Sequence, residues 1–196
     1  MRIRTSATAL LLLLALTVGA CGSTPPAATT QATEPSTTAT EGPAGPSGPI
    51  DFDGVGPAKQ GMTSDEIEGY FGKPVGQDVV PGCPLDANAK KQLVLKYDLS
   101  GGQLTLTFTT GDTDALLSTF TDSPELETVQ GIKVGDSYDD LKKAAGDELK
   151  PENLGAEATP EQGFWYVAKA EGQWITYDVD KGKVARILSG NTPACE

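Results

Sequence analysis

Two segments of the sequence share one pattern of glycine, capping and apolar residues. They span 61–72 and 135–146, and glycine stands at both ends of each. Thr63 and Ser137 occupy matching positions, and an acidic residue follows each of them three positions later. A hydroxyl residue followed in this way is typical of a helix N-terminus with a capping box. The 74-residue offset therefore indicates an internal repeat in which each unit opens with a short helix.

The apolar residues inside both segments have the spacing of one helix face. Positions i, i+3 and i+4 are Ile67, Tyr70 and Phe71 in the first segment, and Leu141, Ala144 and Ala145 in the second. Gly72 and Gly146 follow, as expected for left-handed C-caps. We predict about two turns of capped helix in each segment, packed by one face.

Alternating apolar and polar residues after each segment predict strands. In the first half the strands are expected at 93–99 and 104–109, around a Gly101-Gly102 turn. In the second half they are expected at 163–169, 173–179 and 183–188, with turns at Glu171-Gly172 and Lys181-Gly182. Alternation of this kind is typical of an antiparallel sheet that is covered on one face.

A helix followed by strands in each half predicts an α+β fold. We expect two helix-plus-β-meander repeats, about 55–125 and 130–196, forming an antiparallel sheet with helices on one face. A tandem repeat whose units open with Gly-x-[Thr/Ser]-x-x-[Glu/Asp]-[Ile/Leu]-x-x-x-x-Gly resembles the β-lactamase-inhibitor-protein-like family, and the single unit resembles small lipoproteins that assist outer-membrane assembly. The resemblance covers about Val55 to Cys195. It implies the fold and maps no inhibitor contact residue onto this chain.

The N-terminal residues have the pattern of an export signal. Arg2 and Arg4 precede an uncharged, leucine-rich stretch over 7–20, which is short for a membrane-spanning helix. Val18-Gly19-Ala20-Cys21 then resembles the lipobox of bacterial lipoproteins, which implies cleavage before Cys21 and a diacylglyceryl group on its thiol. Two acyl chains are enough for stable membrane anchoring. The alternatives are a short transmembrane anchor, or ordinary secretion with Cys21 as a plain thiol.

The segment after Cys21 has the composition of a spacer. Residues 22–49 are almost all Ser, Thr, Pro, Ala and Gly, and only Glu34 and Glu41 are charged. Such a segment has too little apolar surface to offset its ordering entropy, so we expect disorder and a mean reach of about 30 Å. The predicted organisation is a signal peptide (1–20), a lipidated cysteine with its tether (21–49) and one folded domain (50–196). O-linked sugar on the tether is the alternative to a bare spacer.

Two cysteines remain once Cys21 carries lipid. Cys83 and Cys195 form an even pair outside the cytoplasm, which favours a disulfide between the first half and the C-terminal end. The alternative is a redox-active pair, although the sequence has no Cys-x-x-Cys motif.

Charge and the lack of histidine narrow the functional classes. Without Arg2 and Arg4 the chain has 13 basic and 27 acidic residues, a net charge of −14 that disfavours nucleic acid as a partner. No histidine is present, which excludes a Ser-His catalytic pair and removes the commonest metal ligand. Paired carboxylates occur, as in Asp139-Asp140 and in Asp112 with Asp114, but in predicted helix starts and turns. We expect no enzyme activity, no cofactor and no metal.

One acidic segment resembles the start of a calcium loop. It is Asp178-Val179-Asp180-Lys181-Gly182, and Ser189 stands where the closing glutamate of such a loop is required. A tight turn between strands explains the segment better.

The aromatic residues of the second half are candidates for a binding surface. On the strand over 173–179, alternation places Trp174 with Thr176 on the polar face. Tryptophan is enriched at binding hot spots, so we expect partner contacts at Trp174, Thr176, Trp165 and Tyr166. The alternative for Trp174 is packing against a loop or against the other half of the chain. Apolar residues occupy both faces of the strand around Trp165 and Tyr166, so alternation does not assign either side chain to a face.

These features together favour a non-catalytic protein-binding module on the outer face of the membrane. It would be anchored by lipid on Cys21, and its partner would be an envelope or extracellular protein. An inhibitor of a hydrolase is one form of such a module. The alternatives are a structural or assembly factor of the envelope, and a small-ligand sensor or carrier.

Overall fold

The computed structural model describes residues 43–82, 90–152, 157–170 and 173–191. Cys21, Cys83 and Cys195 fall outside these ranges, so the lipid-attachment residue and the disulfide stay predictions. The predicted signal peptide and most of the predicted tether lie outside them as well.

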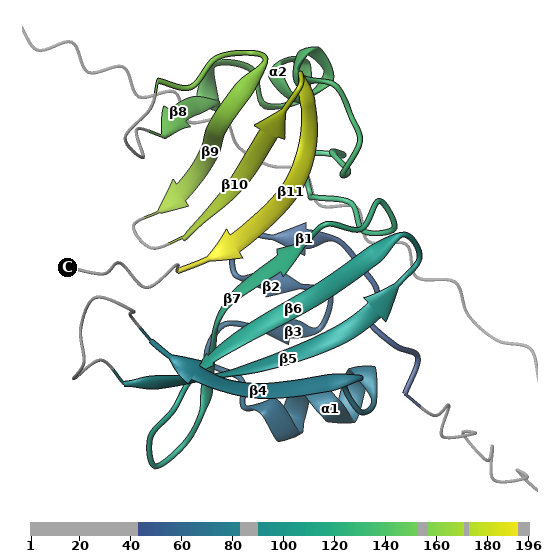
Figure 1. Cartoon of the computed structure of the whole chain (residues 1–196), viewed down its shortest axis with the longest axis vertical. Helices are drawn as coiled ribbons and strands as arrows, with labels where there is room; N and C mark the ends of the chain where they lie inside the picture. The colour runs from purple at the N-terminus through teal and green to yellow at the C-terminus, as the bar shows by residue number, and fades with distance from the viewer. Residues whose placement is uncertain (1–42, 83–89, 153–156, 171–172, 192–196) are drawn as a thin grey trace, which may run out of the picture. The chain divides into compact units, whose positions relative to one another are not determined.

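An eight-stranded antiparallel sheet dominates the described part of the chain (Figure 1). Its strand order is β4-β5-β6-β7-β11-β10-β9-β8. The strands are β4 (Gly76–Pro81), β5 (Lys91–Leu99), β6 (Gly102–Thr109), β7 (Ala115–Thr121), β8 (Lys150–Glu152), β9 (Gln162–Ala170), β10 (Gln173–Asp180) and β11 (Lys183–Gly190). Each half of the chain supplies four consecutive strands. The five strands predicted from alternation are confirmed as β5, β6, β9, β10 and β11.

Two eight-residue helices precede the two sets of strands. They are α1 (Ser64–Phe71), before β4, and α2 (Tyr138–Ala145), which a 3-10 turn, η1 (Gly146–Glu148), separates from β8. Both helices lie where the repeat predicts them.

The helix N-termini follow from the capping residues. The Thr63 hydroxyl accepts a hydrogen bond from the Glu66 amide at 3.3 Å, and the Glu66 carboxylate accepts one from the Thr63 amide at 2.8 Å, which completes a capping box. At α2 the Ser137 hydroxyl accepts from the Asp140 amide at 3.1 Å and donates to the Asp140 carboxylate at 2.5 Å. These bonds to Thr63 and Ser137 lower the pKa values of both carboxyl groups.

The helix faces and C-termini differ in part from the expectation. Ile67 and Phe71 of α1 are buried, but Tyr70 is 52% exposed, so only the i, i+4 pair faces the core. Gly72 and Gly146 have positive φ, but their ψ values of −170° and −133° lie outside the left-handed helical region. The prediction of left-handed caps is therefore wrong, although both backbone conformations still favour glycine.

Three short strands at the start of the domain form a second sheet that the sequence did not predict. They are β1 (Ile50–Asp51), β2 (Gly54–Val55) and β3 (Ala58–Lys59), paired in the order β1-β2-β3. Ile50, Val55 and Ala58 are buried in the core. Two-residue strands are too short to show alternation, so no periodic signal marks them.

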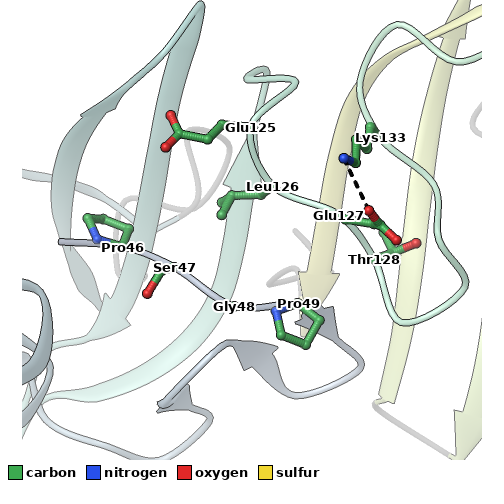
Figure 2. A pocket seen from close by; sticks show the side chains of 9 residues that line it. All are labelled: Pro46, Ser47, Gly48, Pro49, Glu125, Leu126, Glu127, Thr128 and Lys133. Atoms are coloured by element: carbon green, nitrogen blue, oxygen red, sulfur yellow. Dashed lines mark ion pairs between the residues drawn. The ribbon is translucent and has the colours of Figure 1, made fainter. Parts of the chain in front are cut away.

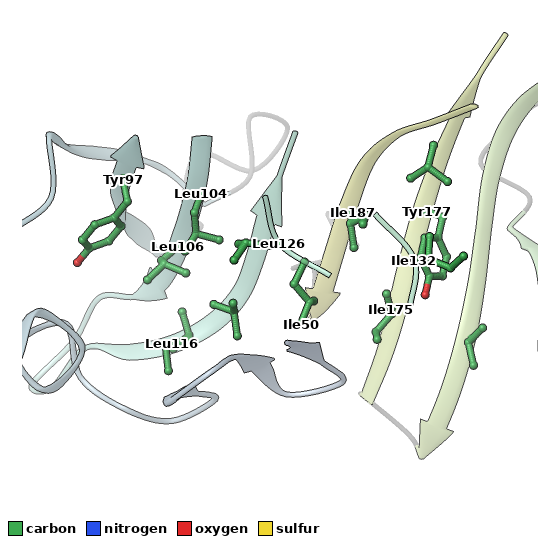
Figure 3. Packing of buried hydrophobic residues seen from close by; sticks show 14 of the residues in the cluster. Ile50, Tyr97, Leu104, Leu106, Leu116, Leu126, Ile132, Ile175, Tyr177 and Ile187 are labelled. Carbon is green, nitrogen blue, oxygen red and sulfur yellow. The ribbon is translucent and has the colours of Figure 1, made fainter. Parts of the chain in front are cut away.

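One continuous core lies against one face of the large sheet, which we call the core face. Strand residues such as Leu104, Leu106, Ile175 and Tyr177 contribute to it from both halves (Figure 3). Ile50 and two residues of the segment between the halves, Leu126 and Ile132, are buried in the same cluster. Phe71 reaches it from α1 and meets Tyr97 of β5 edge-to-face at a ring separation of 5.7 Å.

The predicted fold class is wrong, because the described structure is mostly β. Strands form an eight-stranded and a three-stranded sheet, whereas each α-helix has only eight residues. The core is also not covered by a layer of helices. Ile50, Val55, Leu126 and Ile132 show that β1–β3 and the segment between the halves supply much of the cover.

The two halves join through β7 and β11 at the centre of the sheet. Four residue pairs, from Ile187 opposite Thr121 to Gly190 opposite Ser118, form this junction. The buried hydroxyl groups of Thr119 and Ser189 lie 2.8 Å apart there, within hydrogen-bond distance. A buried polar contact of this kind favours one register between the halves.

Candidate functional site

The face of the large sheet opposite the core, which we call the open face, is a mixed polar and aromatic surface. Strand pairing aligns one row of residues across seven strands. In order the row is Lys96, Thr105, Phe120, Leu188, Thr176, Tyr166 and Lys150. Directly paired residues of an antiparallel sheet share a face, so these side chains all lie on the open face. Neither α-helix contributes to this row.

A hollow of about 360 Å³ lies on the open face at the β8 end of the sheet. It is lined by Trp174 and Thr176 of β10, Tyr166 of β9, and Pro151 and Glu152 of β8. Tyr166 pairs directly with Thr176, and Trp174 lies two residues away from Thr176 on the same face. Three of the four residues predicted to contact a partner thus meet in one place.

Trp165, the fourth predicted residue, lies away from this hollow. It packs against the core, its ring centroid lies 4.9 Å from that of Tyr138 of α2, and its indole N–H donates to the Thr159 carbonyl at 3.3 Å. It pairs with Tyr177, a core residue, so it faces the core side of β9. The neighbouring Tyr166 therefore has the open-face position.

Alternation on β10 is confirmed. Ile175, Tyr177 and Val179 are fully buried, whereas Trp174 is partly exposed. Thr176, predicted on the polar face, is only 8% exposed and forms part of the lining of the hollow.

Sequence reasoning missed Pro151 and Glu152. Their strand has three residues and pairs only with β9, so it gave no alternating pattern. Proline is tolerated at the edge of a sheet because it lacks a backbone donor, and this was the one available signal. Partial burial raises the pKa of the Glu152 carboxyl group.

A second, polar hollow of about 550 Å³ lies on the same sheet near the β10–β11 turn. Asp178 there is 8% exposed and forms an ion pair with Arg186, whose Nε donates to Asp178 Oδ2 at 2.6 Å. The segment that resembled a calcium loop is thus a strand end followed by a tight turn, in which Lys181 and Gly182 have positive φ. Within the described ranges, no group of three or more acidic or cysteine residues could hold a metal ion.

A third hollow, of about 370 Å³, marks where the N-terminal segment meets the domain. Pro46 to Pro49 line it on one side and Glu125 to Thr128 on the other, with Lys133 paired to Glu127 at 3.1 Å (Figure 2). The Ile50 amide donates to the Glu127 carbonyl at 2.8 Å, which fixes this entry point. The hollow is therefore the junction between the chain's N-terminal segment and the fold.

Comparison with known proteins adds little to this geometry. No family model matches the chain, and no curated protein matches it. Among solved structures, an extracellular protein containing an SCP domain from Bacillus anthracis str. Ames is similar at 13% identity with a TM-score of 0.45. The similarity covers 67% of this chain and 43% of that one, so this chain spans less than half of that protein. No helix in the described residues is long and apolar enough to cross a membrane.

Proposed function

We propose that the protein is a lipid-anchored, extracytoplasmic module that binds a protein partner through the open face of its large sheet. The observation that carries this proposal is the hollow formed by Trp174, Tyr166 and Thr176. Tryptophan and tyrosine combine a large contact area with few rotatable bonds, so ordering them on binding costs little entropy. The lipobox-like sequence ending at Cys21 supports the membrane anchor.

The wider open face is suited to a protein partner. The polar and aromatic residues of its aligned row supply hydrogen-bonding groups beside apolar contact area, which is the usual composition of a non-obligate interface. The hollow has walls on β8, β9 and β10 only, whereas small-molecule sites usually enclose most of their ligand. A small-ligand carrier is the second candidate, favoured by the volume of the hollow. A thermal shift with envelope metabolites would support it.

The binding role is tested by chemical crosslinking in intact cells, with the native protein and Trp174→Ala compared. The variant is expected to lose most of the crosslinked partner. Tyr70→Ala is the matched control, because it removes an aromatic side chain that is 52% exposed on α1, a helix that contributes no residue to the open-face row. Equal crosslinking of native protein and Trp174→Ala would contradict the proposal.

The anchor is tested separately by Cys21→Ser. This variant is expected to leave the membrane fraction, whereas native protein stays in it and incorporates labelled fatty acid. Membrane retention of Cys21→Ser without lipid labelling would instead support a transmembrane anchor.

A further inference from the structure

The hollow on the open face combines aromatic rings with one acidic group. Trp174 and Tyr166 come from neighbouring strands, and Glu152 comes from the edge strand beside them. Glu152 pairs with Phe164, which lies two residues from Tyr166, so Glu152 and Tyr166 are diagonal neighbours on the same face. Aromatic faces carry negative charge density and attract cations, as a carboxylate does.

Glu152 makes no ion pair or hydrogen bond with any residue that the structure describes. The nearest cation on its own strand, Lys150, donates instead to the Asp147 carbonyl at 2.7 Å. The adjoining residues 153–156 are Asn, Leu, Gly and Ala, which carry no charge. Its partial burial and raised pKa indicate a carboxylate that has lost water without gaining a counter-ion among the described residues.

Two other acidic groups of this face form ion pairs. Asp178 is held by Arg186, and Asp78 is held by Lys96 at 2.8 Å. The lining of the hollow contains no basic residue, so it offers an anion no charged partner. The net charge of the chain is also negative, which favours approach by a basic partner.

We propose that this hollow receives the cationic side chain, lysine or arginine, of the protein partner. The inference rests on the proposed function and names the chemistry that the site recognises. Its ammonium or guanidinium group lies against the rings of Trp174 and Tyr166 and pairs with the Glu152 carboxylate.

The test is titration of the full-length protein with Nα-acetyl-lysine methylamide, followed by the indole N–H resonance of Trp174 in NMR spectra. The chain has two tryptophans, so Trp165→Phe assigns the signal. The norleucine analogue, which keeps the stem and lacks the charge, is the ligand control at matched ionic strength. The lysine probe is expected to shift the resonance with millimolar affinity, about 1–10 mM, and the norleucine analogue is not.

Glu152→Gln is expected to weaken binding of the lysine probe about tenfold, because it removes the charge and keeps the shape. Glu148→Gln, on an exposed residue that does not line the hollow, is the matched control and is expected to bind as the native protein does. Unchanged resonances elsewhere in the spectrum show that each variant is folded.

Three results would overturn the inference. They are no shift up to about 50 mM lysine probe, an equal shift with the norleucine analogue, and unchanged binding by Glu152→Gln. The proposed function would survive them if crosslinking still depended on Trp174. Conversely, cation binding without any Trp174-dependent partner would leave the cation site standing, remove the protein-binding role, and overturn the inference that the cation belongs to a protein partner.

Discussion

Two buried tyrosines show how much the surroundings of one hydroxyl group matter. Tyr177 is fully buried and donates to Gln130 Oε1 at 3.1 Å, with Thr128 Oγ1 at 3.4 Å. Tyr97 is 3% exposed, and its hydroxyl has no hydrogen-bond partner among the described residues. A buried polar group without a partner costs stability, whereas a paired one contributes modestly.

Phenylalanine substitutions at these two positions should therefore have opposite effects. Tyr177→Phe is expected to lower the free energy of unfolding by about 1 kcal/mol, because it leaves Gln130 without its donor. Tyr97→Phe is expected to leave it unchanged or raise it by up to about 1 kcal/mol. Urea denaturation of both variants measures the difference. Equal destabilisation by both would show that the Tyr97 hydroxyl has a partner.

Tyr177 also makes the free energy of unfolding depend on pH in the alkaline range. Burial raises the pKa of Tyr177 to about 12, from about 10 in the unfolded chain. The folded state holds the proton of the Tyr177 hydroxyl more tightly than the unfolded chain does. The resulting contribution to the stability of the folded state is complete below pH 10 and is lost as the pH rises towards 12. We expect the free energy of unfolding to fall by roughly 3 kcal/mol over this range because of Tyr177. Denaturation at several alkaline pH values measures it, and Tyr177→Phe should show a shallower fall.

At the residue scale, alternation predicted the faces of those candidate binding residues that lie within one long strand. On β10, the buried residues Ile175, Tyr177 and Val179 identify the core face. Alternation then places Trp174 and Thr176 on the opposite face. Trp165 and Tyr166 could not be assigned, because apolar residues occupy both faces of β9. Glu152 was not found, since a three-residue edge strand has no period of its own.

At the scale of elements, local sequence signals predicted the helices and the long strands. They did not predict the other segments that cover the core face of the large sheet. The capping residues Thr63 and Ser137 mark both helix starts. The predicted fold class is wrong because it assigns the cover of the sheet to the two helices. Buried residues of β1–β3 and of the segment 122–136 cover much of the core face. Neither region has a periodic pattern of apolar residues.

The β7–β11 junction favours glycine at position 190, where an added side chain would clash with the neighbouring strand. Gly190 has φ +87°, and a Cβ there would lie 2.5 Å from the Leu117 carbonyl oxygen. Gly135 has a similar φ of +99° with no atom within 4 Å, so it is a matched control for backbone strain alone. Gly135→Ala is expected to cost about 1–2 kcal/mol, and Gly190→Ala at least about 3 kcal/mol. Thermal or urea denaturation measures both. Similar losses would show that the junction can relax around the added methyl group.

At the scale of the whole molecule, the fold separates a core face from an open face, and the proposed binding surface lies on the open face. The core face is covered by the helices, β1–β3 and the segment between the halves. The open face carries the aligned row and the hollow around Trp174 and Glu152. The proposed lipid on Cys21 and the tether would hold this surface within tens of ångströms of the membrane, about 30 Å on average. The partner should therefore be sought in the cell envelope.

The most direct test of this account is site-specific photo-crosslinking in living cells. A photoreactive amino acid is placed at Ala168, an exposed residue that pairs with Trp174 on the open face, and separately at Tyr70 on α1. We predict a discrete crosslinked protein from position 168, identified by mass spectrometry, and none from position 70. Crosslinks from position 70 with none from position 168 would contradict the assignment of the open face as the binding surface.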